Sequence, residues 1–167
     1  MLIWEYMEGN NKVQPRAILV FGAPASGKTT FAEKFSNKFH AAFYDLVEIK
    51  KKYKFDRKTI LKSIELIAKT KANIVIEGGL DTEKERNEIR NILRKAGYSP
   101  SLIWIQTDVG TIKLRLKMKY KDGSKAKGEY EAKIDKMEAP TEIENPIVLS
   151  GKHTFETQLR HVLTQIS

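Results

Sequence analysis

Residues 20–35 read VFGAPASGKTTFAEKF, and two different hydrophobic patterns meet within this stretch. Residues 17–21 form a continuous apolar run, which is typical of a strand buried on both faces of a parallel sheet. After the turn, phenylalanines recur every four residues at Phe31, Phe35 and Phe39, which predicts a helix over 29–39 with one apolar face. The free N–H groups of the first helical turn then lie at the end of a strand, where they attract an anion. The stretch therefore predicts a phosphate-binding loop.

The spacing within this loop makes the phosphate prediction specific. The pattern G-x-x-x-x-G-K-[ST], in which the backbone curls around nucleotide phosphates, is satisfied by Gly22, Gly27, Lys28 and Thr29. We expect Lys28 to reach the β- and γ-phosphates and the Thr29 hydroxyl to bind Mg²⁺. The predicted nucleotide-binding residues of the loop are Gly22, Ala23, Pro24, Ala25, Ser26, Gly27, Lys28, Thr29 and Thr30.

The composition narrows the class of protein. The chain has 167 residues, 41% hydrophobic and 31% charged, which suits a single domain, 1–167, with a sizeable core. It contains no cysteine, which excludes disulfides, thiolate zinc sites and a cysteine nucleophile and is typical of a reducing compartment. No apolar stretch approaches the roughly 18 residues of a membrane-spanning helix. We therefore expect a cytoplasmic protein with no membrane partner, in which residues 1–15 form an N-terminal arm or an extra strand.

Positive charge is concentrated in two segments. The formal net charge is +9, and residues 111–136 hold nine Lys or Arg against four acids. A second cluster, residues 50–54, reads KKKYK. Basic clusters near a phosphate site suit a polyanionic ligand, and a solvated lysine surface explains them equally well. The basic segment at about 110–138 is the candidate for a lid that closes over the site.

Strand-like and helix-like segments alternate along the chain. Short apolar runs predict further strands at 41–44, 73–77, 102–105 and 146–149. Apolar residues at helical spacing predict helices at 58–70, from a capping box at 82–85 to Gly97, at 109–120 and from 155 to 166, whereas 121–128 reads as a polar loop. Together with the phosphate-binding loop after the first strand, this alternation predicts an α/β protein with a three-layer P-loop NTPase fold. We expect a five-stranded parallel sheet, in the order 2-3-1-4-5, with helices on both faces.

Two acids follow predicted strands at the edge of the sheet where ligands bind in such folds. Asp45 is the candidate base for an acceptor hydroxyl, and its alternative role is to cap the next helix. Glu77 is expected to hold Mg²⁺ together with Thr29, and its alternative is an acid satisfied by the glycine turn at 78–79. We expect Gly22 and Thr107 to emerge at the same edge.

Two cations one turn apart are the candidates for contact with the transferring phosphate. Arg115 is expected to fold over the γ-phosphate, and Lys119 to add to the ATP-binding set. Their alternative role is a solvated helix face. The histidines lack the spacing of a ligand set and are interpreted as structural, and the loop 150–153 is a candidate for stacking on the purine.

Five segments resemble the small P-loop kinases of the polynucleotide kinase and zeta-toxin group, which are built like nucleoside monophosphate kinases. They are GAPASGKTT (22–30), FYD (43–45), IVIEGGL (74–80), RNEIRNILRKAGY (86–98) and LIWIQTDVGTIKLRLKMK (102–119). The resemblance implies that Asp45 deprotonates or orients the acceptor hydroxyl. The lid of that group carries two arginines four residues apart, and here Lys119 takes the second place without the planar fork of an arginine. The acid at the position of Glu77 is often Asp in that group.

These features together predict a P-loop kinase. We expect an ATP-dependent phosphotransferase that moves the γ-phosphoryl group of Mg-ATP to a hydroxyl, with a nucleic-acid 5′-hydroxyl or a nucleotide as the acceptor. A kinase of a small metabolite or nucleotide sugar is an alternative with the same catalytic parts. A non-catalytic ATP-binding switch module is the alternative from a different class.

Overall fold

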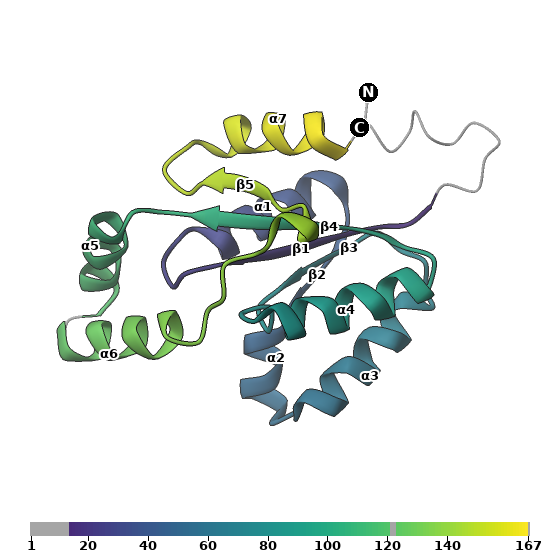
Figure 1. Ribbon diagram of the computed structural model, residues 1–167, viewed down its shortest axis with the longest axis horizontal. Helices are drawn as coiled ribbons and strands as arrows, with labels where there is room; N and C mark the ends of the chain where they lie inside the picture. Colours follow the sequence, from purple (N-terminus) through teal and green to yellow (C-terminus); the bar gives the residue numbers. More distant parts are fainter. Residues whose placement is uncertain (1–13, 121–122, 167) are drawn as a thin grey trace.

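A computed structural model describes residues 14–120 and 123–166. The fold is built on one five-stranded sheet whose neighbouring strands all run parallel, in the order β2-β3-β1-β4-β5 (Figure 1). The strands are β1 (Arg16–Gly22), β2 (Ala42–Asp45), β3 (Ile74–Glu77), β4 (Ser99–Gln106) and β5 (Ile147–Ser150). The predicted fold class and strand order are confirmed. The predicted N-terminal arm lies outside the described residues except for residues 14 and 15.

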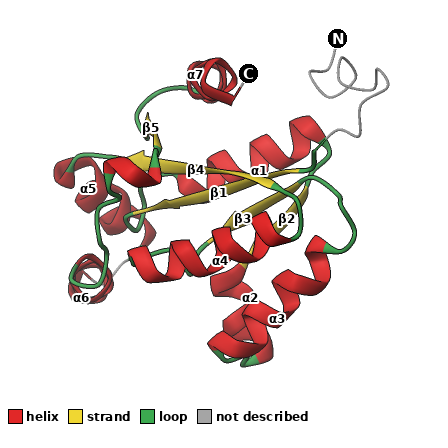
Figure 2. Cartoon of the chain, turned by 45° about the vertical axis from the view of Figure 1, so that its right-hand side comes forward, coloured by secondary structure: helices red, strands yellow, loops and turns green. Residues whose placement is uncertain are grey.

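Helices connect the strands and cover both faces of the sheet (Figure 2). They are α1 (Lys28–Phe39), α2 (Leu46–Tyr53), α3 (Arg57–Ala68), α4 (Glu83–Lys95), α5 (Val109–Lys119), α6 (Gly123–Ile134) and α7 (Phe155–Ile166), with a short 3-10 helix, η2 (Glu142–Glu144), before β5. Among the described residues, no helix has both the length and the apolar character needed to cross a membrane.

The alternation of side chains along β1 creates two separate cores. Leu19 and Phe21 pack on the face covered by α2, α3 and α4, where Ile64 and Ile89 are fully buried. Val20 faces the opposite side, covered by α1 and α7, with the phenylalanines of α1. Burial of each such side chain stabilises the fold by about 1.5–3 kcal/mol. The continuous apolar run of β1 is therefore explained by helices on both faces (Figure 1).

The register of the strands brings the predicted site residues to one edge of the sheet. Glu77 at the end of β3 pairs with Val20 of β1 on one side and with Asp45 of β2 on the other. On the other side of β1, Gly22 pairs with Ile105 of β4. The carboxyl ends of β1, β2, β3 and β4 therefore lie at the edge of the sheet where the loop between β1 and α1 begins.

The segment after β4 corrects one prediction. Residues 123–128, expected as a loose loop, belong to α6. Tyr130 and Ile134 of this helix pack with Leu116 of α5 and with Ala23 of the phosphate-binding loop. The sequence of α6 has no strong apolar period, so its helical state depends on this packing rather than on a pattern visible in the sequence.

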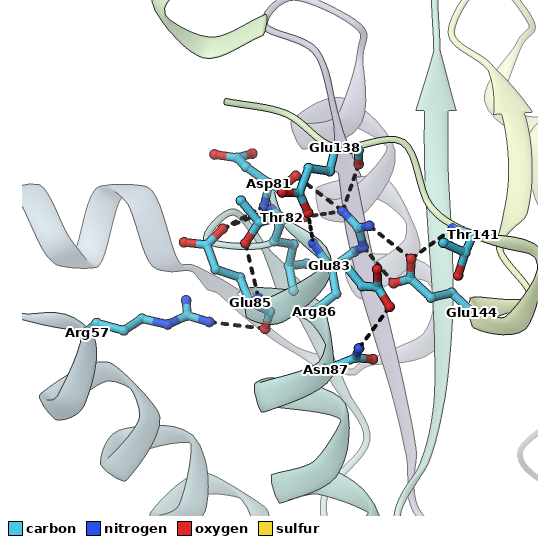
Figure 3. Close-up of polar contacts among 11 residues, drawn as sticks. Arg57, Asp81, Thr82, Glu83, Glu85, Arg86, Asn87, Glu138, Thr141 and Glu144 are labelled. Carbon is cyan, nitrogen blue, oxygen red and sulfur yellow. Dashed lines mark hydrogen bonds and ion pairs between the residues drawn. The ribbon is translucent and has the colours of Figure 1, made fainter. Parts of the chain in front are cut away.

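A buried ion pair anchors the chain that returns from α6 to the sheet (Figure 3). The Arg86 side chain of α4 is fully buried, and its Nε and Nη2 donate to the two carboxylate oxygens of Glu144 at 2.7 and 2.9 Å. Its Nη1 donates to the carbonyl oxygens of Asp81 and Glu138, at 3.2 and 2.9 Å. The Glu138 backbone N–H donates in turn to the Asp81 carbonyl at 2.8 Å. This arrangement, the Arg86 anchor, fixes the end of the α5–α6 segment to the loop that follows β3.

Candidate active site

The loop between β1 and α1 has the backbone of a phosphate cradle. Gly27, at φ 101°, caps α1 in the left-handed region that favours glycine. At Gly22 an added Cβ would collide with the carbonyl oxygen of Ile105, because β1 and β4 approach closely there. The loop closes on itself through a hydrogen bond from the Ser26 N–H to the Ala23 carbonyl at 3.2 Å. The N–H groups at the start of α1 are therefore held where an anion binds.

Lys28, Thr29 and Glu77 meet at the centre of the site. The Thr29 hydroxyl donates to Oε1 of Glu77 at 2.9 Å, and the Lys28 Nζ lies 3.9 Å from the same oxygen. Lys28 also donates to the Ala23 carbonyl at 3.3 Å. The Glu77 side chain is 4% exposed, so this carboxylate is almost completely withdrawn from water.

Burial shifts the titration of both charged groups in this cluster toward their neutral forms. The pKa of Lys28 is lowered by desolvation, which the Glu77 charge offsets in part. The pKa of Glu77 is raised by desolvation, against the opposing effects of Lys28 and of the Thr29 hydrogen bond. A nearby Lys133 disfavours the charge of Lys28 and favours that of Glu77. The cluster therefore holds charges that a bound triphosphate and a divalent cation would help to stabilise.

The donor set of this cluster fits a magnesium ion. Oε2 of Glu77 is buried and makes no hydrogen bond to any described residue. The other oxygen of the same carboxylate, Oε1, accepts the hydrogen bond from the Thr29 hydroxyl. Within the described ranges, no three His, Cys, Asp or Glu side chains gather into a metal cage. Mg²⁺ bound with a nucleotide needs only one or two protein oxygens, because phosphate oxygens and water complete its shell.

Asp45 ends β2 and caps α2. Its Oδ1 accepts hydrogen bonds from the N–H groups of Val47 and Glu48 at 2.9 and 3.0 Å. The capping role considered from the sequence is therefore present. The same residue also lines the cavity that contains Lys28, Thr29 and Glu77.

One cavity of about 650 Å³ is lined by most of the predicted site residues, whereas Gly22, Ala23 and Ser26 do not line it. Its walls come from the phosphate-binding loop, α1, the ends of β2 and β3, α5, α6 and the start of α7. The charged residues that line it are Lys28, Lys34, Asp45, Glu77, Arg115, Lys119 and Lys133. Cations outnumber acids among them, which suits a ligand with several negative charges.

Arg115 contacts the outer side of the phosphate-binding loop. Its Nη1 donates to the carbonyls of Ala25 and Ser26 at 3.0 and 3.2 Å, and its Nη2 to the Gly151 carbonyl at 2.9 Å. The Thr107 hydroxyl also donates to the Ser26 carbonyl, at 2.9 Å. The guanidinium thus joins the phosphate-binding loop to the turn after β5 while it lines the cavity.

Some lining residues were not predicted as site residues from the sequence, among them Lys34, Lys133 and Phe155. Lys133 lies in α6, which was not recognised as a helix, whereas Lys34 and Phe155 lie in helices whose other residues form the core. Lys34 sits over the Phe155 ring, 5.8 Å from its centre. No motif identifies them: Lys133 and Phe155 reach the cavity through the packing of distant segments, and Lys34 lies on α1 beyond the end of the phosphate-binding motif. His153, interpreted as structural, also lines the cavity together with Gly151.

The sheet order and the phosphate-binding loop define a P-loop kinase-like α/β protein. A family model described as an AAA domain matches residues 18–142, which is about three quarters of the 167 residues, and the chain belongs to this family. No curated protein sequence matches the chain.

Several solved structures share the fold over about nine tenths of the chain. A gluconokinase from Sinorhizobium meliloti 1021 superposes with a TM-score of 0.68 at 13% identity, covering 90% of this chain and 91% of that one. Chaetomium thermophilum Kti12, in complex with ADP-AlF3, gives 0.67 at 17% identity, with 90% and 96% covered. The Mycobacterium tuberculosis APS kinase CysC, in complex with AMPPNP and APS, gives 0.64 at 15% identity, with 92% and 98% covered. These likenesses show the fold that the chain shares with these proteins, and the polynucleotide kinase and zeta-toxin resemblance stays a prediction.

Proposed function

We propose that the protein is an ATP-dependent phosphotransferase that moves the γ-phosphoryl group of Mg-ATP to a hydroxyl. The observation that carries this proposal is the contact of Lys28 and Thr29 with Glu77 in the same cavity as Asp45. Phosphoryl transfer needs a phosphate cradle, a cation-holding acid and a group that orients the nucleophile, and one cavity supplies all three.

Each residue has a defined task in this reaction. The loop 22–29 binds the phosphates, Lys28 steadies the β- and γ-oxygens, and Thr29 and Glu77 would hold the magnesium ion, which neutralises phosphate charge when bound. Asp45 accepts the proton of the acceptor hydroxyl as the acceptor oxygen bonds to the γ-phosphorus. The bond between the γ-phosphorus and the β,γ-bridging oxygen breaks, and ADP leaves.

The substitution Asp45→Asn tests the transfer reaction without disturbing the fold. Asparagine caps a helix as well as aspartate, so α2 keeps its first hydrogen bonds. We expect ATP binding within about threefold of wild type and a loss of about 10²–10⁴-fold in transfer, which is the usual contribution of a general base. Incubation with γ-labelled ATP, magnesium and fractionated cell extract would detect the labelled acceptor.

The matched control is Asp56→Asn. Asp56 caps α3 in the same manner, with the Thr59 N–H donating to its Oδ1 at 2.7 Å, but it does not line the cavity. Transfer should be unchanged in this variant, and Lys28→Ala should lose nucleotide binding. Wild-type transfer in the Asp45→Asn protein would remove Asp45 from the mechanism. Nucleotide binding with no labelled product in the wild-type protein would favour the switch module.

The acceptor has two candidate classes, and each has its own support. A nucleic-acid 5′-hydroxyl or a nucleotide suits the net charge of +9 and the exposed lysines at 50–52. A small metabolite suits the cavity of about 650 Å³, which is in the usual range for small-molecule sites, and the gluconokinase and APS kinase among the similar structures.

Salt dependence separates the two classes. Binding of a single-stranded polynucleotide should weaken with a slope of ~0.7 in log affinity against log salt for each phosphate contacted. Binding of a small acceptor should show a shallow slope that reflects its own charge alone. Titration of a fluorescent oligonucleotide at salt concentrations from about 50 to about 200 mM, where such losses of affinity are large, measures the slope. A flat slope would exclude the polynucleotide acceptor.

A further inference from the structure

Lys133 reaches the site from a part of the chain that no motif marks. It lies at the end of α6 and lines the cavity with Lys28, Asp45 and Glu77. Its side chain is one-third exposed, and its Nζ lies 3.6 Å from Oδ2 of Asp81. This distance is too long for a hydrogen bond, so the contact orients the ammonium without committing its donors.

The end of α6 is held firmly near the loop after β3. Ile134, next to Lys133, packs in the cluster of α5 and α6. A few residues later the Arg86 anchor attaches the chain through the Glu138 carbonyl, close to the Asp81 backbone (Figure 3). Lys133 is therefore placed by the packing and anchoring of the residues that follow it rather than by its own long side chain.

Two other cations of the site, Lys28 and Arg115, are already engaged with the phosphate-binding loop. Lys28 already contacts Glu77 and the Ala23 carbonyl, on the side of the phosphate-binding loop. Arg115 donates to backbone carbonyls at the outer side of that loop. Lys133 lines the same cavity from α6, beside Asp81 of the loop after β3, and it interacts electrostatically with both Lys28 and Glu77. A phosphoryl group in transfer carries its charge on equatorial oxygens, which need cations on more than one side.

We infer that Lys133 is a catalytic residue whose ammonium contacts the transferring phosphoryl group from the α6 wall of the cavity. This inference rests on the proposed function and leaves its bond changes as given above. The attraction between the Lys133 ammonium and the phosphoryl group is strongest in the transition state. Lys133 therefore acts on the rate of transfer more than on nucleotide binding.

Aluminium fluoride with ADP tests the contact without knowledge of the acceptor, because the planar anion stands in for the transferring group. Calorimetric titration of ADP with magnesium, with and without aluminium fluoride, gives the gain in affinity that the anion causes. In Lys133→Gln we expect this gain to fall about tenfold or more, as for the loss of a charge-assisted hydrogen bond, with ADP affinity alone within about threefold of wild type. Lys133→Arg should restore part of the gain.

The control is Lys127→Gln on the same helix. Lys127 is 75% exposed, pairs with Glu131 and does not line the cavity, so this variant should match wild type in both titrations. Thermal unfolding of each variant checks that the fold is kept. An undiminished gain in Lys133→Gln would overturn the inference and leave the proposed function standing. A wild-type protein that binds ADP and shows no gain would contradict the proposed function, and the inference with it.

Discussion

At the scale of single residues, the site depends on charges that the fold stabilises poorly. Lys28 and Glu77 are withdrawn from water, and desolvation shifts the pKa of each toward its neutral form. Their mutual attraction offsets only part of this cost. Such a cluster is typical of a functional site, where a ligand supplies the missing compensation.

The pH dependence of stability should report the buried Glu77 carboxyl. Its pKa is raised in the folded protein, so its contribution to the free energy of unfolding is greatest below the unfolded value of about 4.3 and is lost as the pH rises above it. Glutamine stays neutral throughout. We therefore expect the stability of Glu77→Gln, relative to wild type, to increase from pH 4 to pH 7. Urea unfolding in metal-free buffer measures it, and a relative stability that decreases over this range would contradict the raised pKa.

At the scale of elements, the site is formed where loops from distant strands touch. The turn after β5 lies against the phosphate-binding loop, and at Gly151 an added Cβ would collide with the Ser26 carbonyl and the Thr107 hydroxyl. Asp108 caps α5 and pairs with Lys152 at 2.7 Å, which fixes the same turn to the start of α5. The close approach therefore couples nucleotide binding to the position of this turn.

Gly151→Ala should displace the phosphate-binding loop. The collision with backbone and hydroxyl atoms should cost about 1–3 kcal/mol of stability, as for other overpacked sites, and ATP affinity should fall with it. Gly128→Ala is the matched control, because a Cβ there meets nothing within 4 Å and alanine favours the helix. Thermal unfolding with and without ATP measures both effects. Wild-type ATP affinity in the Gly151→Ala variant would show that the turn and the loop move independently.

The elements also show what the sequence could and could not predict. The phosphate-binding loop and the strand-end acids followed from local patterns, because each is encoded within a few consecutive residues, whereas the sheet order followed from the P-loop fold class that the loop indicates. Helix α6 did not, since Tyr130 and Ile134 are stabilised by contacts with α5 rather than by an apolar period. The contact of Thr29 with Glu77 joins residues 48 positions apart, and it depends on the register of β1 with β3 together with the path of the loop from β1 into α1.

At the scale of the whole molecule, one buried ion pair ties the α5–α6 segment to the body of the fold. Arg86 and Glu144 are 58 positions apart, so no local sequence pattern predicts their pairing. Arg86 also lies over the Phe21 ring, 4.9 Å from its centre, and so connects the anchor to the core around β1. The hydrogen bonds from Arg86 hold the pKa of Glu144 below its usual range.

Arg86→Met should destabilise the protein by about 3–5 kcal/mol, because it leaves the Glu144 carboxylate buried and uncompensated. The double variant Arg86→Met with Glu144→Leu should recover most of this loss, since an apolar pair of similar volume replaces the ion pair. Urea unfolding of wild type, both single variants and the double variant completes the cycle. Additive losses would show that the two side chains contribute independently.

Asp45 both caps a helix and lines the cavity, so its codon is exposed to selection for folding and to selection for activity. A library of all substitutions there, sorted for soluble protein, should retain serine, threonine and asparagine beside aspartate, since each caps a helix. The same library sorted for phosphorylated product should retain aspartate alone. The gap between the two enrichment profiles would measure how much of the residue's preservation is due to chemistry rather than to folding.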